Sequence, residues 1–175
     1  ERYGGTSYLY PPSSGQYGRG WAVSYIPLCT DPEDFAFLVR HEALGHAFAK
    51  LADENSSEAN GEIPSSLISD IKAKEKYGWW SNVDFTSDPS AVKWAPFISD
   101  ERYASERVGV YKGGWGYWTG IWTPSWRSIV KGNSDAFNAP SRQAIWNRVM
   151  NLSNGPDWTP SYEAFVEYDS GTTER

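Results

Sequence analysis

The segment His-Glu-Ala-Leu-Gly-His at 41–46 constrains this chain more than any other feature, because it holds the only two histidines among 175 residues. A glutamate, Glu42, follows the first histidine directly. Zinc hydrolases often carry H-E-x-x-H, in which two imidazoles one helical turn apart bind Zn²⁺ and the glutamate acts as general base. Here the spacing is one residue longer. Five residues advance about 500° along a regular α-helix, so His46 would point roughly 140° away from His41.

Both imidazoles can face one metal ion only if the helix widens locally. A single π-type turn absorbs one extra residue, and such turns concentrate at functional sites. Gly45 is the residue that would make this distortion inexpensive for the backbone. The alternative is a pair of helical histidines with no metal, which the H-E-x-x-x-H pattern alone does not exclude.

The flanking sequence favours a buried amphipathic helix around this segment. Apolar residues precede and follow it at spacings of three to four, namely Phe35, Phe37, Leu38, Leu44, Phe48 and Leu51. Thr30 or Asp31 is a candidate N-cap, and Pro32 suits the first turn, so the helix is predicted to begin near residue 32. Histidine and glutamate inside such a helix need partners, which a cation would supply.

The remaining pattern predicts a single α+β domain, 1–175, rich in helix and with a small sheet. We expect a strand over 20–26, a helix from about 63 to 77, a short helix over 97–106, a short strand over 108–111 and a last helix from Arg142 to about Leu152. No internal repeat or linker divides the chain.

Composition excludes several classes of partner. The net charge of −6 and the sequence pI near 4.9 argue against nucleic acid or an anionic membrane surface. No apolar run approaches the 18 or so residues that cross a bilayer. Cys29 is the single cysteine, so the sequence neither requires nor excludes an oxidising compartment. The sequence does not determine the oligomeric state.

Two blocks of sequence resemble a known family. The run HEALGHAFAKLADE at 41–54 looks like the signature of the IgA-specific metallopeptidase family, a group of secreted or surface-attached bacterial zinc peptidases with metzincin-like catalytic domains. The segments 113–124, 128–130 and 137–145 are similar to that family's region after the zinc helix. The resemblance implies a metzincin-like fold, bound Zn²⁺, a protein or peptide substrate, and a location outside the cell or on the bacterial surface.

The chain also departs from the family pattern. Val130 stands where the family typically has methionine beneath the metal, which keeps an apolar floor. Ala49 stands where relatives often have glycine, so the turn after the helix is expected to be harder to make. The start at Glu1 leaves little room for the strands that normally precede the edge strand. We therefore expect an N-terminally truncated catalytic domain, the C-terminal part of a longer protein.

The third zinc ligand must be a carboxylate, because no histidine remains. Asp53 is the first choice, since metzincin-type sites take this ligand from just past the zinc helix. Glu54, Glu101 and Glu106 are alternatives. An Asp-Glu pair at a helix end is also a common solvated cap.

These assignments imply peptide hydrolysis, with Glu42 as general base on zinc-bound water. Tyr117, ahead of Tyr111, is the candidate donor to the tetrahedral intermediate. Extended substrate would pair with the edge strand at 21–26.

A different interpretation is a catalytically degenerate pseudo-peptidase that binds peptide or carbohydrate through aromatic residues, since four of the ten tryptophans lie within 113–126. A closed structural zinc site fits less well, because such sites favour several cysteines.

Overall fold

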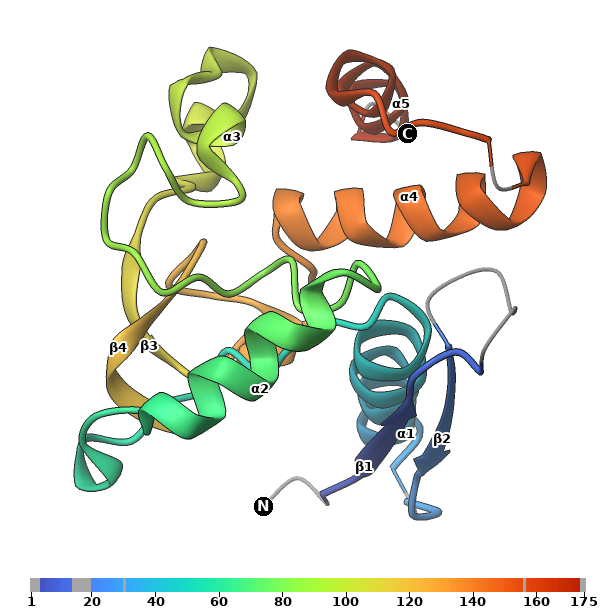
Figure 1. Ribbon diagram of the computed structural model, residues 1–175. Helices are drawn as coiled ribbons and strands as arrows, with labels where there is room; N and C mark the ends of the chain where they lie inside the picture. The colour runs from blue at the N-terminus through green and yellow to red at the C-terminus, as the bar shows by residue number, and fades with distance from the viewer. Residues whose placement is uncertain (1–3, 14–19, 30, 156, 174–175) are drawn as a thin grey trace.

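The computed structural model describes residues 4–13, 20–29, 31–155 and 157–173 of the chain (Figure 1). Within these residues the fold is α+β, as predicted, with helices around two separate two-stranded antiparallel sheets. No helix in the described part of the chain is both long and apolar enough to cross a membrane.

The first sheet is a hairpin that packs on the helix carrying the histidines. Strands β1 (Thr6–Tyr10) and β2 (Trp21–Tyr25) pair with Ser7 opposite Ser24, and both contact the following helix (Figure 1). The strand predicted over 20–26 is confirmed as β2. Strand β1 was not predicted, although its residues are rich in β-formers.

The histidine helix begins where the sequence indicated. Helix α1 (Pro32–Leu38) starts after Asp31, whose Oδ1 accepts hydrogen bonds from the backbone N–H groups of Glu33 at 2.7 Å and Asp34 at 3.2 Å. Thr30, the other candidate cap, lies outside the described residues. The π-helix η1 (Val39–Phe48) continues α1 directly.

The middle of the chain consists of short elements. These are η2 (Glu58–Asn60), α2 (Ser65–Glu75), α3 (Ala95–Ser99) and η3 (Glu101–Glu106). The predicted helix from about 63 to 77 corresponds to α2. The single helix predicted over 97–106 is instead two, because Asp100 is extended and its carboxylate accepts the backbone N–H of Arg102 at 3.0 Å as the cap of η3.

The second sheet and the last helices complete the fold. They are β3 (Tyr111–Gly114), β4 (Tyr117–Thr123), η4 (Ile129–Lys131), α4 (Ala139–Asn154) and α5 (Tyr162–Thr173). The strand predicted over 108–111 is wrong, since β3 only begins at Tyr111. Helix α4 begins three residues earlier than predicted, because Asn138 Oδ1 accepts the backbone N–H of Ser141 at 3.0 Å. Helix α5 was not predicted.

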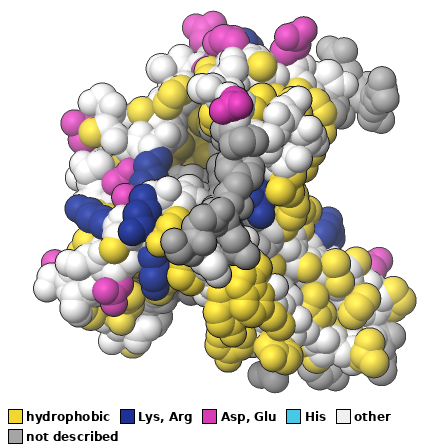
Figure 2. Space-filling model, turned by 45° about the vertical axis from the view of Figure 1, so that its right-hand side comes forward, with side chains coloured by type: hydrophobic (Ala, Val, Ile, Leu, Met, Phe, Trp, Pro, Cys, Tyr) yellow, Lys and Arg dark blue, Asp and Glu magenta, His cyan; other side chains and the backbone are white. Residues whose placement is uncertain are grey.

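Three apolar clusters hold these elements together, and two of them border the site. One lies beneath the histidine helix and contains Phe37, Leu38, Ile129, Val130 and Ala144. Another is built around Trp79 and Trp80 and packs against Tyr117 and Trp115. The third joins α3, η3, α4 and α5. Hydrophobic side chains also gather over the lower part of the face shown in Figure 2.

Candidate metal centre

The widened helix brings the two histidines onto one face. Helix η1 has π hydrogen bonding from Val39 to Phe48, and the Ala49 N–H continues it by donating to Leu44 O, five residues back, at 3.0 Å. His41 Nε2 and His46 Nε2 are 3.0 Å apart. The prediction of a local widening is therefore confirmed, but the π segment is ten residues long rather than a single turn.

Gly45 contributes space rather than backbone freedom. It is not among the glycines with positive φ. A Cβ at this position would lie 2.9 Å from Val130 Cγ1 and 3.3 Å from Phe137 Cε1. Val130 is fully buried, so it forms the apolar floor that the sequence led us to expect. A glycine is needed because this floor lies directly against the helix.

Two backbone carbonyls set the tautomers of the imidazoles. His41 Nδ1 is 2.7 Å from Ile129 O, and His46 Nδ1 is 2.9 Å from Leu51 O. Because a carbonyl only accepts, each Nδ1 carries a hydrogen, and in its neutral form each imidazole keeps the lone pair on Nε2. Orientation of histidine by a hydrogen bond from its other nitrogen is typical of metal sites.

Asp53 reaches the histidines because the chain turns sharply after the helix. Its Oδ1 lies 3.4 Å from His46 Nε2 and 3.8 Å from His41 Nε2, and the side chain is half exposed. Lys50 makes the turn with φ of +60°, and Leu51 N–H donates to Gly45 O at 3.0 Å. The expected obstacle at Ala49 is thus avoided, since the left-handed residue is the next one along.

These three side chains fit a divalent cation. Their candidate ligand atoms all lie within 4.8 Å of one another. Two lone pairs and a carboxylate that converge repel one another unless a proton or a cation lies between them. A set of two imidazole nitrogens and one carboxylate oxygen suits Zn²⁺ and leaves a coordination position open.

The other candidate carboxylates lie elsewhere. Glu54 is fully buried and accepts hydrogen bonds from Asn82 at 2.9 Å and Asn138 at 3.2 Å. Burial raises the pKa of Glu54 to about 7, although those hydrogen bonds favour its charged form. Glu106 pairs with Arg142 at 2.6 Å, and Glu101 is exposed on η3. None of the three belongs to the histidine cluster.

Burial and the charges of neighbouring groups shift the pKa values of the three side chains in the cluster. Burial, together with the charge of His46, lowers the pKa of His41. Burial also disfavours charge on His46, but its hydrogen bond to Asp53 and the charge of Asp53 outweigh this and raise the pKa of His46. Burial acts to raise the pKa of Asp53, yet the contacts with His46 and His41 lower it overall.

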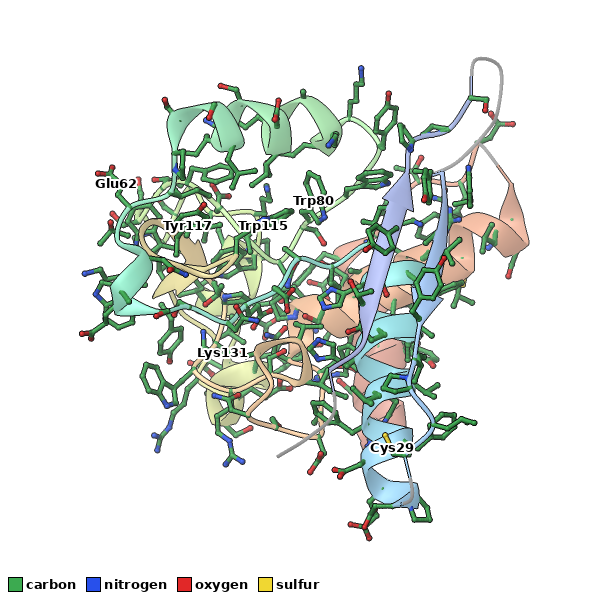
Figure 3. All side chains as sticks on the ribbon, turned by 90° about the horizontal axis from the view of Figure 1, so that it is seen from below. Cys29, Glu62, Trp80, Trp115, Tyr117 and Lys131 are labelled. Carbon is green, nitrogen blue, oxygen red and sulfur yellow. The ribbon has the colours of Figure 1, made fainter. Side chains whose placement is uncertain are left out.

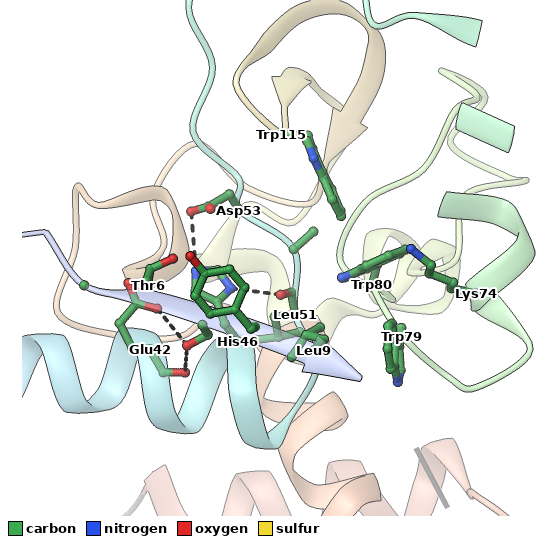
Figure 4. Close-up of a pocket in the computed structure, with 14 residues that line it drawn as sticks. Thr6, Leu9, Glu42, His46, Leu51, Asp53, Lys74, Trp79, Trp80 and Trp115 are labelled. Carbon is green, nitrogen blue, oxygen red and sulfur yellow. Dashed lines mark hydrogen bonds and ion pairs between the residues drawn. The ribbon is translucent and has the colours of Figure 1, made fainter. Parts of the chain in front are cut away.

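Glu42 lies beside this cluster in an open cavity. Its carboxylate is buried, and Oε2 accepts a hydrogen bond from Ser7 Oγ at 2.8 Å. The cavity has a volume of about 340 Å³. Besides Glu42, its walls are His46, Asp53, residues 5–9 of the first strand region, Leu51, Ala52, Lys74, Trp79, Trp80 and Trp115 (Figure 4). A candidate general base and two candidate ligands thus face one solvent-accessible space.

The structure does not bring Tyr117 into this cavity. Tyr117 packs against the cluster around Trp79 and Trp80, near Trp115 (Figure 3). The Tyr111 hydroxyl donates to Arg107 O at 2.8 Å. Among the tryptophans within 113–126, Trp115 lines the cavity. Its ring centroid lies 4.7 Å from that of Trp80.

The strand along the cavity is β1 rather than the predicted strand over 21–26. Residues 6–9 of β1 line the cavity, whereas those of β2 do not. The sequence signal that could have identified β1 was the β-rich run Thr-Ser-Tyr-Leu-Tyr.

Comparison with known proteins adds no assignment. No protein-family model matches the sequence, and no curated protein shows a significant match.

Proposed function

We propose that this chain is a zinc-dependent endopeptidase domain of the metzincin-like type, similar to the IgA-specific metallopeptidases, which cleaves a protein outside the cell or at the bacterial surface. The observation that supports this best is the convergence of two lone-pair-bearing Nε2 atoms and the Asp53 carboxylate beside Glu42. The family and the location rest on the sequence resemblance.

His41, His46 and Asp53 would hold the metal ion. When bound, Zn²⁺ lowers the pKa of water toward neutrality and polarises a carbonyl group. Glu42 Oε2 is engaged by Ser7, so Oε1 is the oxygen that takes the proton of the attacking water and returns it to the leaving amine. Ile129 and Leu51 keep the histidines in the required tautomer.

Strand β1 would align the substrate. Within the described chain it pairs only with β2, so its other edge offers N–H and C=O groups beside the cavity. The wall made by Trp80 and Trp115 would contact an apolar side chain of the substrate.

The test is the zinc content of protein dialysed against dilute zinc and then buffer, followed by a peptide-hydrolysis assay. We expect about one zinc per chain, and turnover that Glu42→Gln abolishes while zinc is retained. His46→Ala should lose both. Absence of zinc, or zinc without turnover on a diverse peptide library, would overturn the proposal.

One further cavity favours the alternative of a binding module. It has a volume of about 260 Å³ and is lined by Trp118 and Trp126 together with Lys112 and Lys131. Aromatic faces beside ammonium groups suit a ring-bearing or acidic ligand. A zinc-free protein that binds acidic saccharides or peptides would support this alternative, and Trp126→Ala should then weaken binding.

A further inference from the structure

Two serines on the first hairpin meet the side chain of Glu42. Ser7 on β1 and Ser24 on β2 are directly opposite in the strand register, and their hydroxyl oxygens are 2.8 Å apart. Ser7 Oγ lies 2.8 Å from Glu42 Oε2 and 3.0 Å from Glu42 O. Ser24 Oγ lies 3.4 Å from the same carbonyl. Ser7 and Ser24, which precede Glu42 by 35 and 18 residues, thus connect the hairpin to the helix.

The proton count gives this contact a direction. A hydroxyl carries one proton, and an ionised carboxylate only accepts. The Ser7 proton therefore goes to Glu42 Oε2, which leaves Ser24 to donate to Ser7 Oγ. The result is a chain from Ser24 to Ser7 to the carboxylate. A hydrogen bond to a charged acceptor is stronger than one between neutral groups.

Gly5 closes the other side of the same carboxylate. A Cβ on Gly5 would lie 2.6 Å from Glu42 Cγ and 3.0 Å from both Cδ and Oε1. Any side chain at this position would displace Glu42, because real Cβ atoms do not approach carbon so closely. Ser7 on β1 thus holds the carboxylate by a hydrogen bond on one oxygen, and Gly5, directly before β1, packs closely against the rest of the side chain.

We propose that Ser7, supported by Ser24 and given room by Gly5, is a positioning residue that fixes the Glu42 carboxylate through its Oε2 atom. Its effect on catalysis rests on the proposed function. The physical coupling between Ser7 and Glu42 does not, so the two can be tested separately.

The first test is a double-mutant cycle in urea unfolding of the zinc-free protein, with Ser7→Ala and Glu42→Met. Methionine has similar length but lacks the carboxylate acceptor. We expect the two substitutions to be coupled by about tenfold in the unfolding equilibrium constant. Ser69→Ala, which removes an exposed hydroxyl bonded to Ser65 O at 3.0 Å, is the matched control and should show no coupling to Glu42. Coupling below about twofold would overturn the inference.

The second test uses kinetics of the zinc-loaded protein. Ser7→Ala should lower kcat about tenfold or more while KM and zinc affinity remain as in the wild type, and Ser7→Thr should restore most of kcat. An unchanged kcat in Ser7→Ala would overturn the positioning role. A wild type that cleaves no peptide, yet shows the unfolding coupling, would refute the proposed function and leave the Ser7–Glu42 contact established.

Discussion

Replacement of Gly45 by alanine tests whether the π-helix is held by close packing on Val130. In an ordinary helix interior this substitution stabilises a protein by up to about 1 kcal/mol, because alanine has the better helix propensity. At Gly45 the new Cβ would lie 2.9 Å from Val130 Cγ1, a side chain with no exposed surface. Carbon atoms prefer separations of roughly 3.5–4.0 Å. Val130 or the helix must therefore move.

The size of the effect follows from these two opposing contributions. Overpacking of a buried site typically costs about 1–3 kcal/mol. After the propensity gain of about 1 kcal/mol, we expect a net destabilisation of roughly 1 kcal/mol. In a chain of this length that corresponds to a fall in Tm of about 2–4 °C. Movement of the helix would also alter the 3.0 Å separation of the two Nε2 atoms, so zinc affinity should fall with stability.

The assay is urea unfolding and thermal denaturation of the zinc-free protein, with two comparisons. Gly171→Ala in α5 is the matched control, since nothing lies within 4 Å of a Cβ there, and it should raise stability. Val130→Ala removes the obstructing methyl groups, so its cost and that of Gly45→Ala should not add. A Gly45→Ala variant as stable as Gly171→Ala would refute this account of the glycine.

Three other predictions concern the site. Burial raises the pKa of Glu54 to about 7 from 4.5, so the stability that its proton provides is complete below pH 4.5 and is lost as the pH rises through 7. As the pH rises from 4.5 to 7, the free energy of unfolding of the zinc-free Glu54→Gln variant should increase relative to that of the wild type, by about 3 kcal/mol at most. A difference that stays constant with pH would contradict this prediction. Asp53→Ala should weaken zinc binding, measured by chelator competition, by more than the roughly 10–100-fold typical of a residue that only hydrogen-bonds to a metal ligand. Zinc affinity equal to that of the wild type would show that Asp53 is not a ligand. Gly5→Ala should reduce kcat without loss of zinc, because its Cβ displaces Glu42; unchanged kcat would show that the carboxylate tolerates the shift.

The local sequence was sufficient for features that depend on neighbours along the chain. The His41–His46 spacing required a widened helix, because both imidazoles belong to one helical segment whose periodicity is known. Asp31 and Pro32 marked its start, because capping involves residues only two or three positions apart. The strand predicted over 20–26 from β-rich residues between turn formers was confirmed as β2, whereas the one predicted over 108–111 was wrong.

The tertiary structure decided how the site is completed. The carbonyl that orients His41 belongs to Ile129, 88 residues away, and the hydroxyl that holds Glu42 belongs to Ser7, 35 residues away. The approach of Asp53 depends on a left-handed turn at Lys50, a residue type that gives no local signal for it. Glu54, adjacent to Asp53, points instead to Asn82 and Asn138. Sequence periodicity records which face of an element is apolar, but the partners that meet across that face are chosen only when distant segments pack.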